Sequence, residues 1–376
     1  MIVFSEEQLA HQEQLIQFLK YALHGKGRLT FAEFMEIVLY APALGYYSAG
    51  MQKFGKAGDF VTAPLISPLF SACLANQYLQ ILPHINNPCI LELGAGNGIM
   101  AARSLLHLGE HKQLPEKYYI LERSGDLRER QQATIQELCP QYFDKFDWLD
   151  SLEDLKFNGI IVGNEVLDAL PVHLFQIGPD KAILEAYVHF DAQQFQLTYD
   201  KATTPVVEYV QNLQQQLELP KGYASEINLM QKPLLTSLNS VLQQGVMIWI
   251  DYGFPQNEYY HPSRHMGTLM CHCQHLAHSD PMVNIGLQDI TAHVDFSALA
   301  QAGLNLGLNI SGYTTQGNFL LANGLLNLAT ISEIHPYQLS QQIQVLTQPH
   351  EMGELFKVIA FSKGIDIELQ GFNPLG

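Results

Sequence analysis

The segment from Glu92 to Gly98, which reads Glu-Leu-Gly-Ala-Gly-Asn-Gly, carries the clearest chemical signal in the chain. It extends an apolar run over 89–93 and leads into helix-forming residues from Ile99. Glycines let the backbone approach a ligand closely, and a helix N-terminus offers free N–H groups. The pattern predicts a strand, a glycine turn and a helix that hold a nucleotide-like ligand. The dinucleotide fingerprint G-x-G-x-x-G is absent because its last position is Ile99. A tight turn that binds nothing is the alternative.

Two acids stand at the ends of other predicted strands. Glu122 closes a strand over 118–122, and in a doubly wound sheet an acid there accepts hydrogen bonds from ribose hydroxyls. Asp251 closes a strand over 246–251 and would border the same pocket. For both residues, the alternative is an acid with only a structural role.

The segment Asn164 to Pro171 (Asn-Glu-Val-Leu-Asp-Ala-Leu-Pro) follows a predicted strand over 159–163. Ligands of open α/β sheets bind beyond the carboxyl ends of the strands, where this segment would lie. If the segment is helical, Glu165 and Asp168 share one face and can grip a guanidinium or an amine. The alternative is a helix N-terminus whose acids only complement its dipole. The segment lacks the Asn-Pro-Pro-Tyr pattern of enzymes that methylate base amino groups.

A cluster of cysteines and histidines, Cys271-His272-Cys273-Gln274-His275 with His278, resembles a metal site at first sight. Its spacing does not match C-x₂₋₄-C with H-x₃₋₅-H, so we predict no metal. A histidine of this loop working at the pocket is the preferred interpretation.

Bulk properties narrow the class of protein. The chain has 376 residues, with 20 basic and 37 acidic residues and a net charge of −17. This charge repels nucleic acid and attracts a cationic substrate. Five scattered cysteines, no visible transit peptide and no uninterrupted apolar span predict a cytoplasmic bacterial protein without membrane insertion.

Strands that alternate with helices predict a doubly wound α/β sheet around these residues. Strands are expected at 89–93, 118–122, 146–149, 159–163 and 246–251, with helices at 99–108 and 125–138. We predict an N-terminal helical segment (1–57), a core (58–170 and 236–376) and an inserted antiparallel and helical subdomain (171–235). The loop 255–288 is expected to be irregular and functional. Later expectations are a helix near 295–302, a strand near 308–314, a helical span within 320–346 and a strand at 355–361.

Several motifs together resemble one family. The run E-x-G-x-G-x-G resembles the first motif of class I S-adenosylmethionine-dependent methyltransferases. The whole chain resembles the MidA-like methyltransferases, bacterial and mitochondrial proteins related to a respiratory complex I assembly factor. The matching stretches are Phe34-Met35, Tyr40-Ala41-Pro42, Gly45-Tyr46-Tyr47, Gly58 to Thr62, Glu92 to Gly98, Leu121-Glu122, Asn164 to Pro171, Asp251-Tyr252-Gly253, Gly267-Thr268-Leu269 with His275, and Gly286 to Phe296.

The resemblance implies a class I methyltransferase fold (Rossmann-like) with an inserted α+β subdomain, and S-adenosylmethionine as methyl donor. It implies arginine methylation of a protein, for the mitochondrial branch a complex I subunit, and it is compatible with a homodimer. Where the family usually has Thr-x-Pro-Glu, this chain has Leu65, which leaves Glu165 and Asp168 as better candidates for gripping the substrate. The predicted cofactor contacts are Glu92, Gly94, Ala95, Gly96, Gly98, Glu122, Leu149, Asp150, Asp59 and Thr62.

Methyl transfer needs alignment, a dry pocket and a proton acceptor. We expect Glu165 and Asp168 to orient the guanidinium while Asn164 lines the methyl channel. Candidates for the proton acceptor are Glu165, Asp168, Asp251, His275 and His293. Two other functions remain open: a non-catalytic assembly or binding factor that keeps the fold, and a small-molecule methyltransferase.

Overall fold

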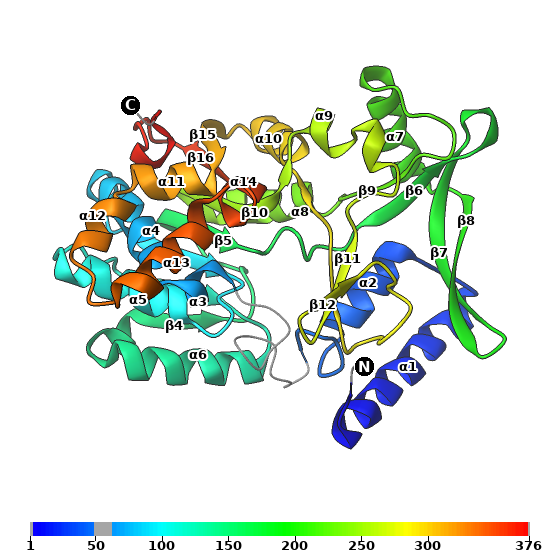
Figure 1. Ribbon diagram of the computed structural model, residues 1–376, viewed down its shortest axis with the longest axis horizontal. Coiled ribbons are helices and arrows are strands. Elements are labelled where there is room, and N and C mark those ends of the chain that lie inside the picture. The colour runs from blue at the N-terminus through cyan, green and yellow to red at the C-terminus, as the bar shows by residue number, and fades with distance from the viewer. Residues whose placement is uncertain (1–2, 49–61, 375–376) are drawn as a thin grey trace. The chain divides into compact units, whose positions relative to one another are not determined.

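The structure is a computed structural model that describes residues 3–48 and 62–374 (Figure 1). Contacts divide the chain into two compact units that interleave along the sequence. Unit 1 comprises Met1–Phe60, Asp168–Gln231 and Phe254–Asp295, and unit 2 comprises Val61–Leu167, Lys232–Gly253 and Phe296–Gly376.

Unit 2 is built on a mixed sheet whose strands run in the order β15-β16-β10-β5-β2-β3-β4 (Figure 1). The pairs β10–β5, β5–β2, β2–β3 and β3–β4 are parallel, whereas β16 is antiparallel to both of its neighbours. The strands are β2 (Cys89–Leu93), β3 (Tyr118–Leu121), β4 (Phe146–Leu149), β5 (Phe157–Asn164), β10 (Leu242–Phe254), β15 (Asn309–Thr315) and β16 (Phe356–Lys363). This order confirms the predicted doubly wound class I methyltransferase fold.

Helices cover both faces of this sheet because the strand order reverses at β2. Crossovers between parallel strands are right-handed, so connections that step from β2 toward β4 and from β5 toward β10 fall on opposite faces. Figure 1 shows α5 and α6 on one side, with α8 and α10 on the other. The helices are α5 (Ile99–Glu110), α6 (Gly125–Leu138), α8 (Gln231–Val241) and α10 (Phe296–Asn305).

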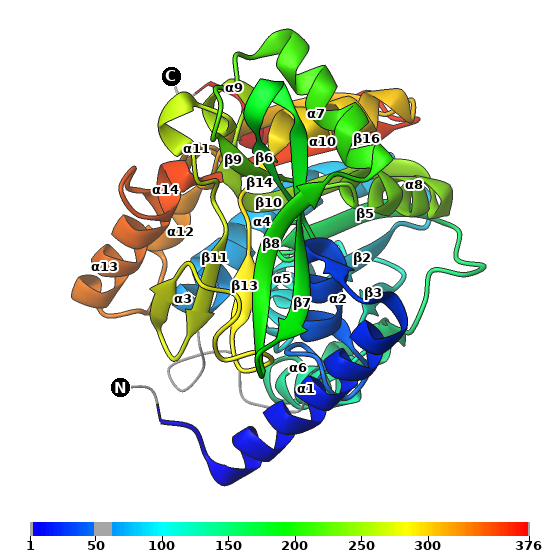
Figure 2. The same cartoon turned by 90° about the vertical axis from the view of Figure 1, so that its right-hand side faces the viewer.

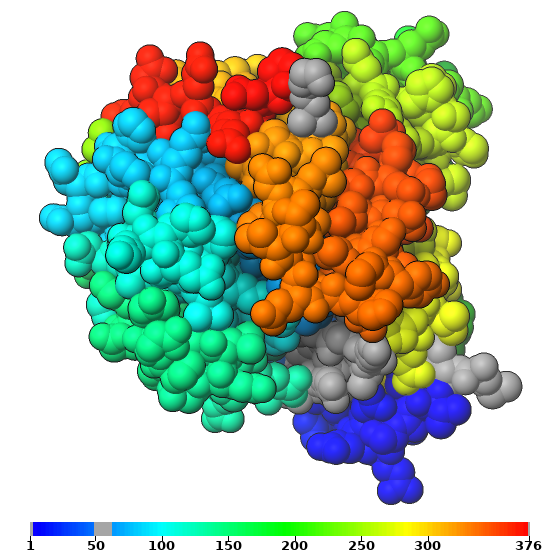
Figure 3. Space-filling model, turned by 60° about the vertical axis from the view of Figure 1, so that its left-hand side comes forward, coloured from blue at the N-terminus to red at the C-terminus, as the bar shows by residue number. Residues whose placement is uncertain are grey.

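The largest core of unit 2 lies on the α5 face. Alternate residues of β10 (Val246, Ile248 and Ile250) point into it, as expected for a strand whose side chains alternate between faces. Helix α4 (Pro68–Ile81) packs there together with α11 (Gln316–Ala322), α12 (Leu325–Thr330) and α13 (Pro336–Thr347). Figure 3 shows these later helices, in orange, against the blue and cyan helices of the same unit. The span expected as helical within 320–346 is therefore divided among three helices.

Unit 1 begins with two capped helices. Ser5 forms a capping box at the start of α1 (Glu6–Lys26). The Ser5 hydroxyl accepts from the Gln8 backbone N–H, and the Ser5 backbone N–H donates to the Gln8 side-chain oxygen. Thr30 forms a second capping box at α2 (Phe31–Tyr40). Each helix begins directly after its capping residue.

An antiparallel sheet follows in unit 1, ordered β1-β7-β6-β9, with β8 paired to β7. Figure 2 shows the long β7–β8 hairpin and α2, which packs against β6 and β7. The elements are β1 (Leu29–Thr30), β6 (His173–Ile177), β7 (Ile183–Asp191), β8 (Gln194–Lys201), α7 (Thr204–Gln216) and β9 (Ala224–Ile227). The predicted antiparallel strands and the helix after them are confirmed.

The segment 255–288 is more regular than the sequence suggests. It contributes β11 (Met270–Cys273) and β12 (Leu276–His278) to a small antiparallel sheet with β13 (Asp289–Thr291). The expectation of an irregular insertion was wrong there because short strands of mixed polarity give no period-two signal.

The remaining short elements are α3 (Ala63–Ile66), α9 (Gln256–Tyr259), β14 (Val294–Asp295) and α14 (Met352–Leu355). Within residues 3–48 and 62–374, no helix is both long and apolar enough to cross a bilayer.

Candidate functional site

The glycine turn between β2 and α5 has the conformation its residues predict. Gly94, Gly96 and Gly98 have φ angles of 64°, 55° and 83°, in the left-handed region that L side chains rarely adopt. The turn is closed by the Gly98 N–H, which donates to the Ala95 carbonyl at 2.7 Å. The helix begins immediately afterwards, so its first N–H groups face the turn.

The turn has no room for side chains at two of these positions. A Cβ on Gly94 would lie 2.7 Å from Val166 Cγ2, and a Cβ on Gly98 would lie 3.1 Å from Gln131 Cα. The backbone therefore packs directly against its neighbours, and the Asn97 side chain caps the first helical N–H, that of Ile99, at 3.2 Å. This cradle fits the carboxypropyl-amine tail of S-adenosylmethionine, which needs backbone donors at close range.

Glu122 directly follows β3 and is held at both carboxylate oxygens. Its Oε1 accepts from the Ser124 N–H at 2.8 Å, and its Oε2 accepts from Gln131 Nε2 at 3.0 Å. Each carboxylate oxygen has two acceptor sites, so capacity remains for ribose hydroxyls. The placement agrees with the ribose role predicted for Glu122, which stays a prediction.

Leu149 and Asp150 mark the end of β4. The Leu149 carbonyl accepts from the Glu122 N–H at 3.0 Å, which ties the two strand ends together. Asp150 is exposed and pairs with Arg128 at 2.5 Å. Their predicted contacts with the cofactor stay predictions.

Glu92 lies in the core rather than at a surface. Its side chain is 0% exposed, and its Oε2 accepts from the Tyr118 hydroxyl at 2.5 Å. Burial raises the pKa of Glu92 to about 7, against the opposing effect of the Tyr118 hydrogen bond. A direct contact of Glu92 with the cofactor stays a prediction.

Two further predicted cofactor contacts are Asp59 and Thr62. Asp59 falls outside the described residues. Thr62 is the N-cap residue of α3. Leu65, which replaces the family's usual glutamate, lies within α3 and is partly buried.

The carboxyl end of β5 carries Asn164 and Glu165. The Asn164 Nδ2 donates to Glu165 Oε1 at 3.1 Å, and the Glu165 N–H donates to the Ile250 carbonyl at 2.9 Å. Glu165 has a φ of 53°, a conformation that costs a non-glycine residue about 1–3 kcal/mol. Strain of this kind persists only where the surroundings enforce it, so the backbone of Glu165 is held by its neighbours, while Asn164 holds one oxygen of the side chain.

The segment after Glu165 is not a helix. Residues 165–170 form bends and turns, so the expectation of a shared helical face for Glu165 and Asp168 was wrong. The left-handed φ of 53° takes Glu165 out of a right-handed helical path. Asp251 Oδ2 accepts from the N–H groups of Val166 at 3.1 Å and Leu167 at 2.9 Å, and these bonds hold the turn that follows.

Asp251 is buried on β10, and its Oδ1 accepts from the Tyr252 N–H at 2.9 Å. Its carboxylate therefore receives three backbone N–H groups. This arrangement favours a role in anchoring the segment that carries Glu165. Its candidature as proton acceptor stays a prediction.

In unit 1, Asp168 is buried beside two tyrosines and a second acid. The Asp168 carbonyl accepts from the Ala292 N–H at 3.0 Å. Tyr40 and Tyr47 stack with ring centroids 5.5 Å apart, and Tyr47 donates to Asp289 Oδ1 at 2.8 Å. Burial is the main cause that raises the pKa of both tyrosines, and the charge of Asp289 is the next. Asp168 then adds to the shift of Tyr40, and Tyr40 to that of Tyr47. The sequence motifs contain Tyr40, Tyr47 and Asp289, but residue type and spacing alone gave no reason to join them.

His293 also lies in unit 1 and is fixed on two sides. Its backbone N–H donates to Thr268 Oγ1 at 2.9 Å, and its ring stacks on Phe254 with ring centroids 5.2 Å apart and an interplanar angle of 6°. The Arg264 guanidinium covers the same Phe254 ring at 3.8 Å. His293 is thus an oriented imidazole, and its role as proton acceptor stays a prediction.

His275 occupies the turn between β11 and β12. Gln274 and His275 have φ angles of 47° and 63°, as in a two-residue hairpin turn with both central residues left-handed. His275 is exposed, whereas Cys271 and Cys273 are buried. In the described part of the chain, no three His, Cys, Asp or Glu side chains are grouped so as to hold a metal ion.

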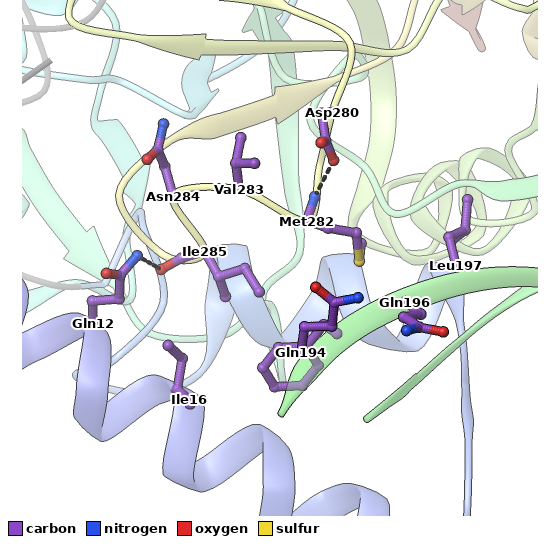
Figure 4. Close-up of a pocket in the computed structure, with 11 residues that line it drawn as sticks. Gln12, Ile16, Gln194, Gln196, Leu197, Asp280, Met282, Val283, Asn284 and Ile285 are labelled. Atoms are coloured by element: carbon purple, nitrogen blue, oxygen red, sulfur yellow. Dashed lines mark hydrogen bonds between the residues drawn. The ribbon is translucent and has the colours of Figure 1, made fainter. Parts of the chain in front are cut away.

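Unit 1 also contains a cavity of about 630 Å³ (Figure 4). None of its lining residues is among the predicted site residues. Figure 4 shows Gln12 and Ile16 of α1 below the loop around Asn284. The cavity is lined by Gln12, Ile16, Gln194, Phe195, Gln196, Leu197, Asp280, Met282, Val283, Asn284 and Ile285.

Sequence and structure comparisons place these features in a family. The model of a family described as "Putative S-adenosyl-L-methionine-dependent methyltransferase" matches residues 73–314. Protein arginine methyltransferase NDUFAF7 homolog of Drosophila melanogaster is 27% identical over 388 residues, covering 93% of this chain and 85% of that protein. Protein arginine methyltransferase NDUFAF7 of Homo sapiens is 27% identical over 382 residues, covering 92% and 82%.

Two solved structures from Burkholderia thailandensis are similar over nearly their whole length. One is a "likely methyl transferase" bound to S-adenosyl-homocysteine, with a TM-score of 0.93, 40% identity and coverage of 99% of this chain and 97% of that one. The second is a native structure with a TM-score of 0.91, 39% identity and the same coverage, 99% and 97%. The cofactor of this protein is S-adenosylmethionine, and the chain belongs to the MidA-like family of S-adenosylmethionine-dependent methyltransferases.

Proposed function

We propose that this methyltransferase modifies the guanidinium nitrogen of an arginine in a protein substrate. Curated relatives at 27% identity carry the name protein arginine methyltransferase. The net charge of −17 attracts a cationic substrate. The MidA-like resemblance adds the narrower proposal that the substrate is a subunit of respiratory complex I.

The observation that carries the proposal is the rigid placement of Glu165 at the carboxyl end of β5. Its backbone is left-handed, its Oε1 receives Asn164 Nδ2, and the next two N–H groups are held by Asp251. A fixed carboxylate can receive two N–H groups of a guanidinium side by side, and this fixes the direction of the remaining nitrogen. The same edge of the sheet carries the glycine turn and Glu122.

The bound donor supplies a methyl group made electrophilic by a sulfonium. The arginine nitrogen forms a bond to that methyl carbon as the carbon–sulfur bond breaks, and the nitrogen then releases one proton. Glu165 orients the guanidinium, and Asn164 lines the path of the methyl group. The proposed proton acceptors are Glu165, Asp168, Asp251, His275 and His293. Among these, Asp251 serves the backbone with both oxygens, which favours the others.

The test uses purified protein, S-adenosylmethionine labelled on the methyl group, and cell extract. A labelled protein band that yields methylarginine on hydrolysis supports the proposal. Glu165→Gln should lower turnover at least about 100-fold while S-adenosylhomocysteine affinity stays within a few-fold, because it removes charge from the acceptor side only. The exposed Glu153, replaced in Glu153→Gln, is the matched control.

Other outcomes would overturn the proposal in distinct ways. Label found only in small molecules would indicate a small-molecule methyltransferase. Cofactor binding without any labelled product would indicate a binding or assembly factor. A large loss of cofactor affinity in Glu165→Gln would assign Glu165 to the cofactor instead.

A further inference from the structure

A buried glutamine of α6 joins the segments predicted to hold the cofactor. Gln131 is 0% exposed. Its Nε2 donates to the Gly96 carbonyl and to Glu122 Oε2, both at 3.0 Å. Its Oε1 accepts from Trp148 Nε1, also at 3.0 Å. One amide therefore connects the middle of the glycine turn, the acid after β3 and the strand β4.

The partners themselves fix which way this amide points. The indole of Trp148 can only donate, and the Gly96 carbonyl can only accept. The oxygen of Gln131 must face Trp148, and the nitrogen must face Gly96 and Glu122. Reversing the amide would oppose donor to donor and acceptor to acceptor in a buried site, which costs more than losing one bond.

The contact between α6 and the turn is also steric. A Cβ on Gly98 would lie 3.1 Å from Gln131 Cα and 3.3 Å from Gln131 Cβ. Gly98, the last glycine of the turn, thus packs directly against the backbone of Gln131. This packing and the hydrogen bond from Gln131 to the Gly96 carbonyl both fix the distance between the turn and α6.

We propose that Gln131 is a positioning residue for the cofactor: it aims the Glu122 carboxylate at the ribose and sets the glycine turn at the matching distance. The proposal rests on the ribose role of Glu122 and not on the identity of the methyl acceptor. A carboxylate held before binding loses less conformational freedom when the ribose arrives, so affinity for the cofactor is higher. Ser124 N–H at the other oxygen of Glu122 completes this restraint.

The test compares two buried glutamines of unit 2. Gln131→Met keeps the size of the side chain and removes its three hydrogen bonds. Gln77→Met is the matched control, because Gln77 is also 0% exposed and its Oε1 accepts from the Gly371 N–H at 2.9 Å, outside the segments predicted to hold the cofactor. Calorimetry with S-adenosylhomocysteine should show Kd raised at least about tenfold in Gln131→Met and less than about twofold in Gln77→Met.

A double-mutant cycle with Glu122→Gln separates positioning from general loosening. If Gln131 acts through Glu122, the Gln131→Met change should cost several-fold less affinity once Glu122 is already replaced. In the methyl-transfer assay, Gln131→Met should raise KM for S-adenosylmethionine more than it lowers kcat. Fully additive losses in the cycle would overturn the proposal, as would equal effects of the two methionine variants.

Gln131→Glu provides a second route if the methionine variant does not fold. It keeps an oxygen for Trp148 and places a second carboxyl group against Glu122, where burial and the like charge favour a shared proton. As the pH is raised and the pair loses this proton, affinity should fall at least about tenfold by like-charge repulsion. Two neighbouring ion pairs, Arg128 with Asp150 and Arg130 with Asp126, are unchanged. Affinity equal to that of wild type up to about pH 9 would refute the positioning role. A protein that binds no cofactor even as wild type would instead contradict the cofactor assignment.

Discussion

Asp251 offers the most direct test of how the structure holds Glu165 in place. Its carboxylate accepts the N–H groups of Val166, Leu167 and Tyr252, and its side chain is 1% exposed. A buried N–H that loses its partner costs about 1–3 kcal/mol. Asp251→Ala leaves three such groups, or about 3–9 kcal/mol, against a typical total stability of about 5–15 kcal/mol. This variant should therefore fold poorly.

Asp251→Asn is the informative change. The asparagine oxygen can still serve Val166 and Leu167, but its amide then faces the Tyr252 N–H. We expect a loss of about 2–3 kcal/mol, made up of one unsatisfied donor and two weakened bonds. At about 2–4 °C per kcal/mol, the melting temperature should fall by about 4–12 °C. Methyl transfer should fall further than stability explains, because the two bonds that hold the turn after Glu165 are weakened.

Thermal melting and a methyl-transfer assay at a temperature where the variant is folded provide the two readings. Asp147→Asn is the control, since Asp147 is a partly exposed strand acid paired with Lys117 at 3.0 Å, and exposed ion pairs contribute about 0–1 kcal/mol. A melting temperature within 1 °C of wild type would refute the anchoring argument. Lost activity with unchanged melting would show instead that Asp251 takes part in the chemistry.

Two more predictions concern the glycine turn and the core beneath it. Gly98→Ala should weaken S-adenosylhomocysteine binding at least about tenfold. Gly307→Ala is the control and should cost only about 1–2 kcal/mol of stability, because Gly307 has a φ of 77° but nothing within 4 Å of an added Cβ. Equal affinities of the two variants for S-adenosylhomocysteine in calorimetry would contradict this prediction. Since the pKa of Glu92 is raised to about 7, the folded state keeps a proton that the unfolded chain releases near pH 4.3, so stability should decrease between about pH 4 and pH 7 by up to about 3 kcal/mol. In Glu92→Gln, stability should lack this decrease with pH. Melting temperatures of wild type and Glu92→Gln that change in parallel from about pH 4 to pH 8 would count against the prediction.

The strands and the glycine turn could be predicted because local sequence determines them. Buried apolar runs produce β2, β3 and β4 within a residue of their expected limits. The glycines of the turn are an equally local signal. Each depends on neighbours within a few positions, which a single sequence displays directly.

The roles of Asp251, Gln131 and Glu92 depend on distant partners and were not predicted. Asp251 accepts from N–H groups more than 80 positions earlier in the chain. The local sequence after Glu165 does not reveal this contact, and so a helix was predicted where the structure has a turn. Gln131 lies in a polar helix that resembles a solvent-exposed one. Glu92 reads as a motif acid, and only its burial beside Tyr118 shows that it faces the core.

The position of β16 in the sheet has a consequence for the synthesis of this protein. β16 follows β15 in the sequence but lies between β15 and β10, pairing with both. While the polypeptide emerges from the ribosome, these two neighbours wait with unsatisfied edges, a state prone to aggregation and proteolysis. A product that stops before residue 356 cannot join them. Chains that end before β16 should therefore aggregate or be degraded more readily than the full chain.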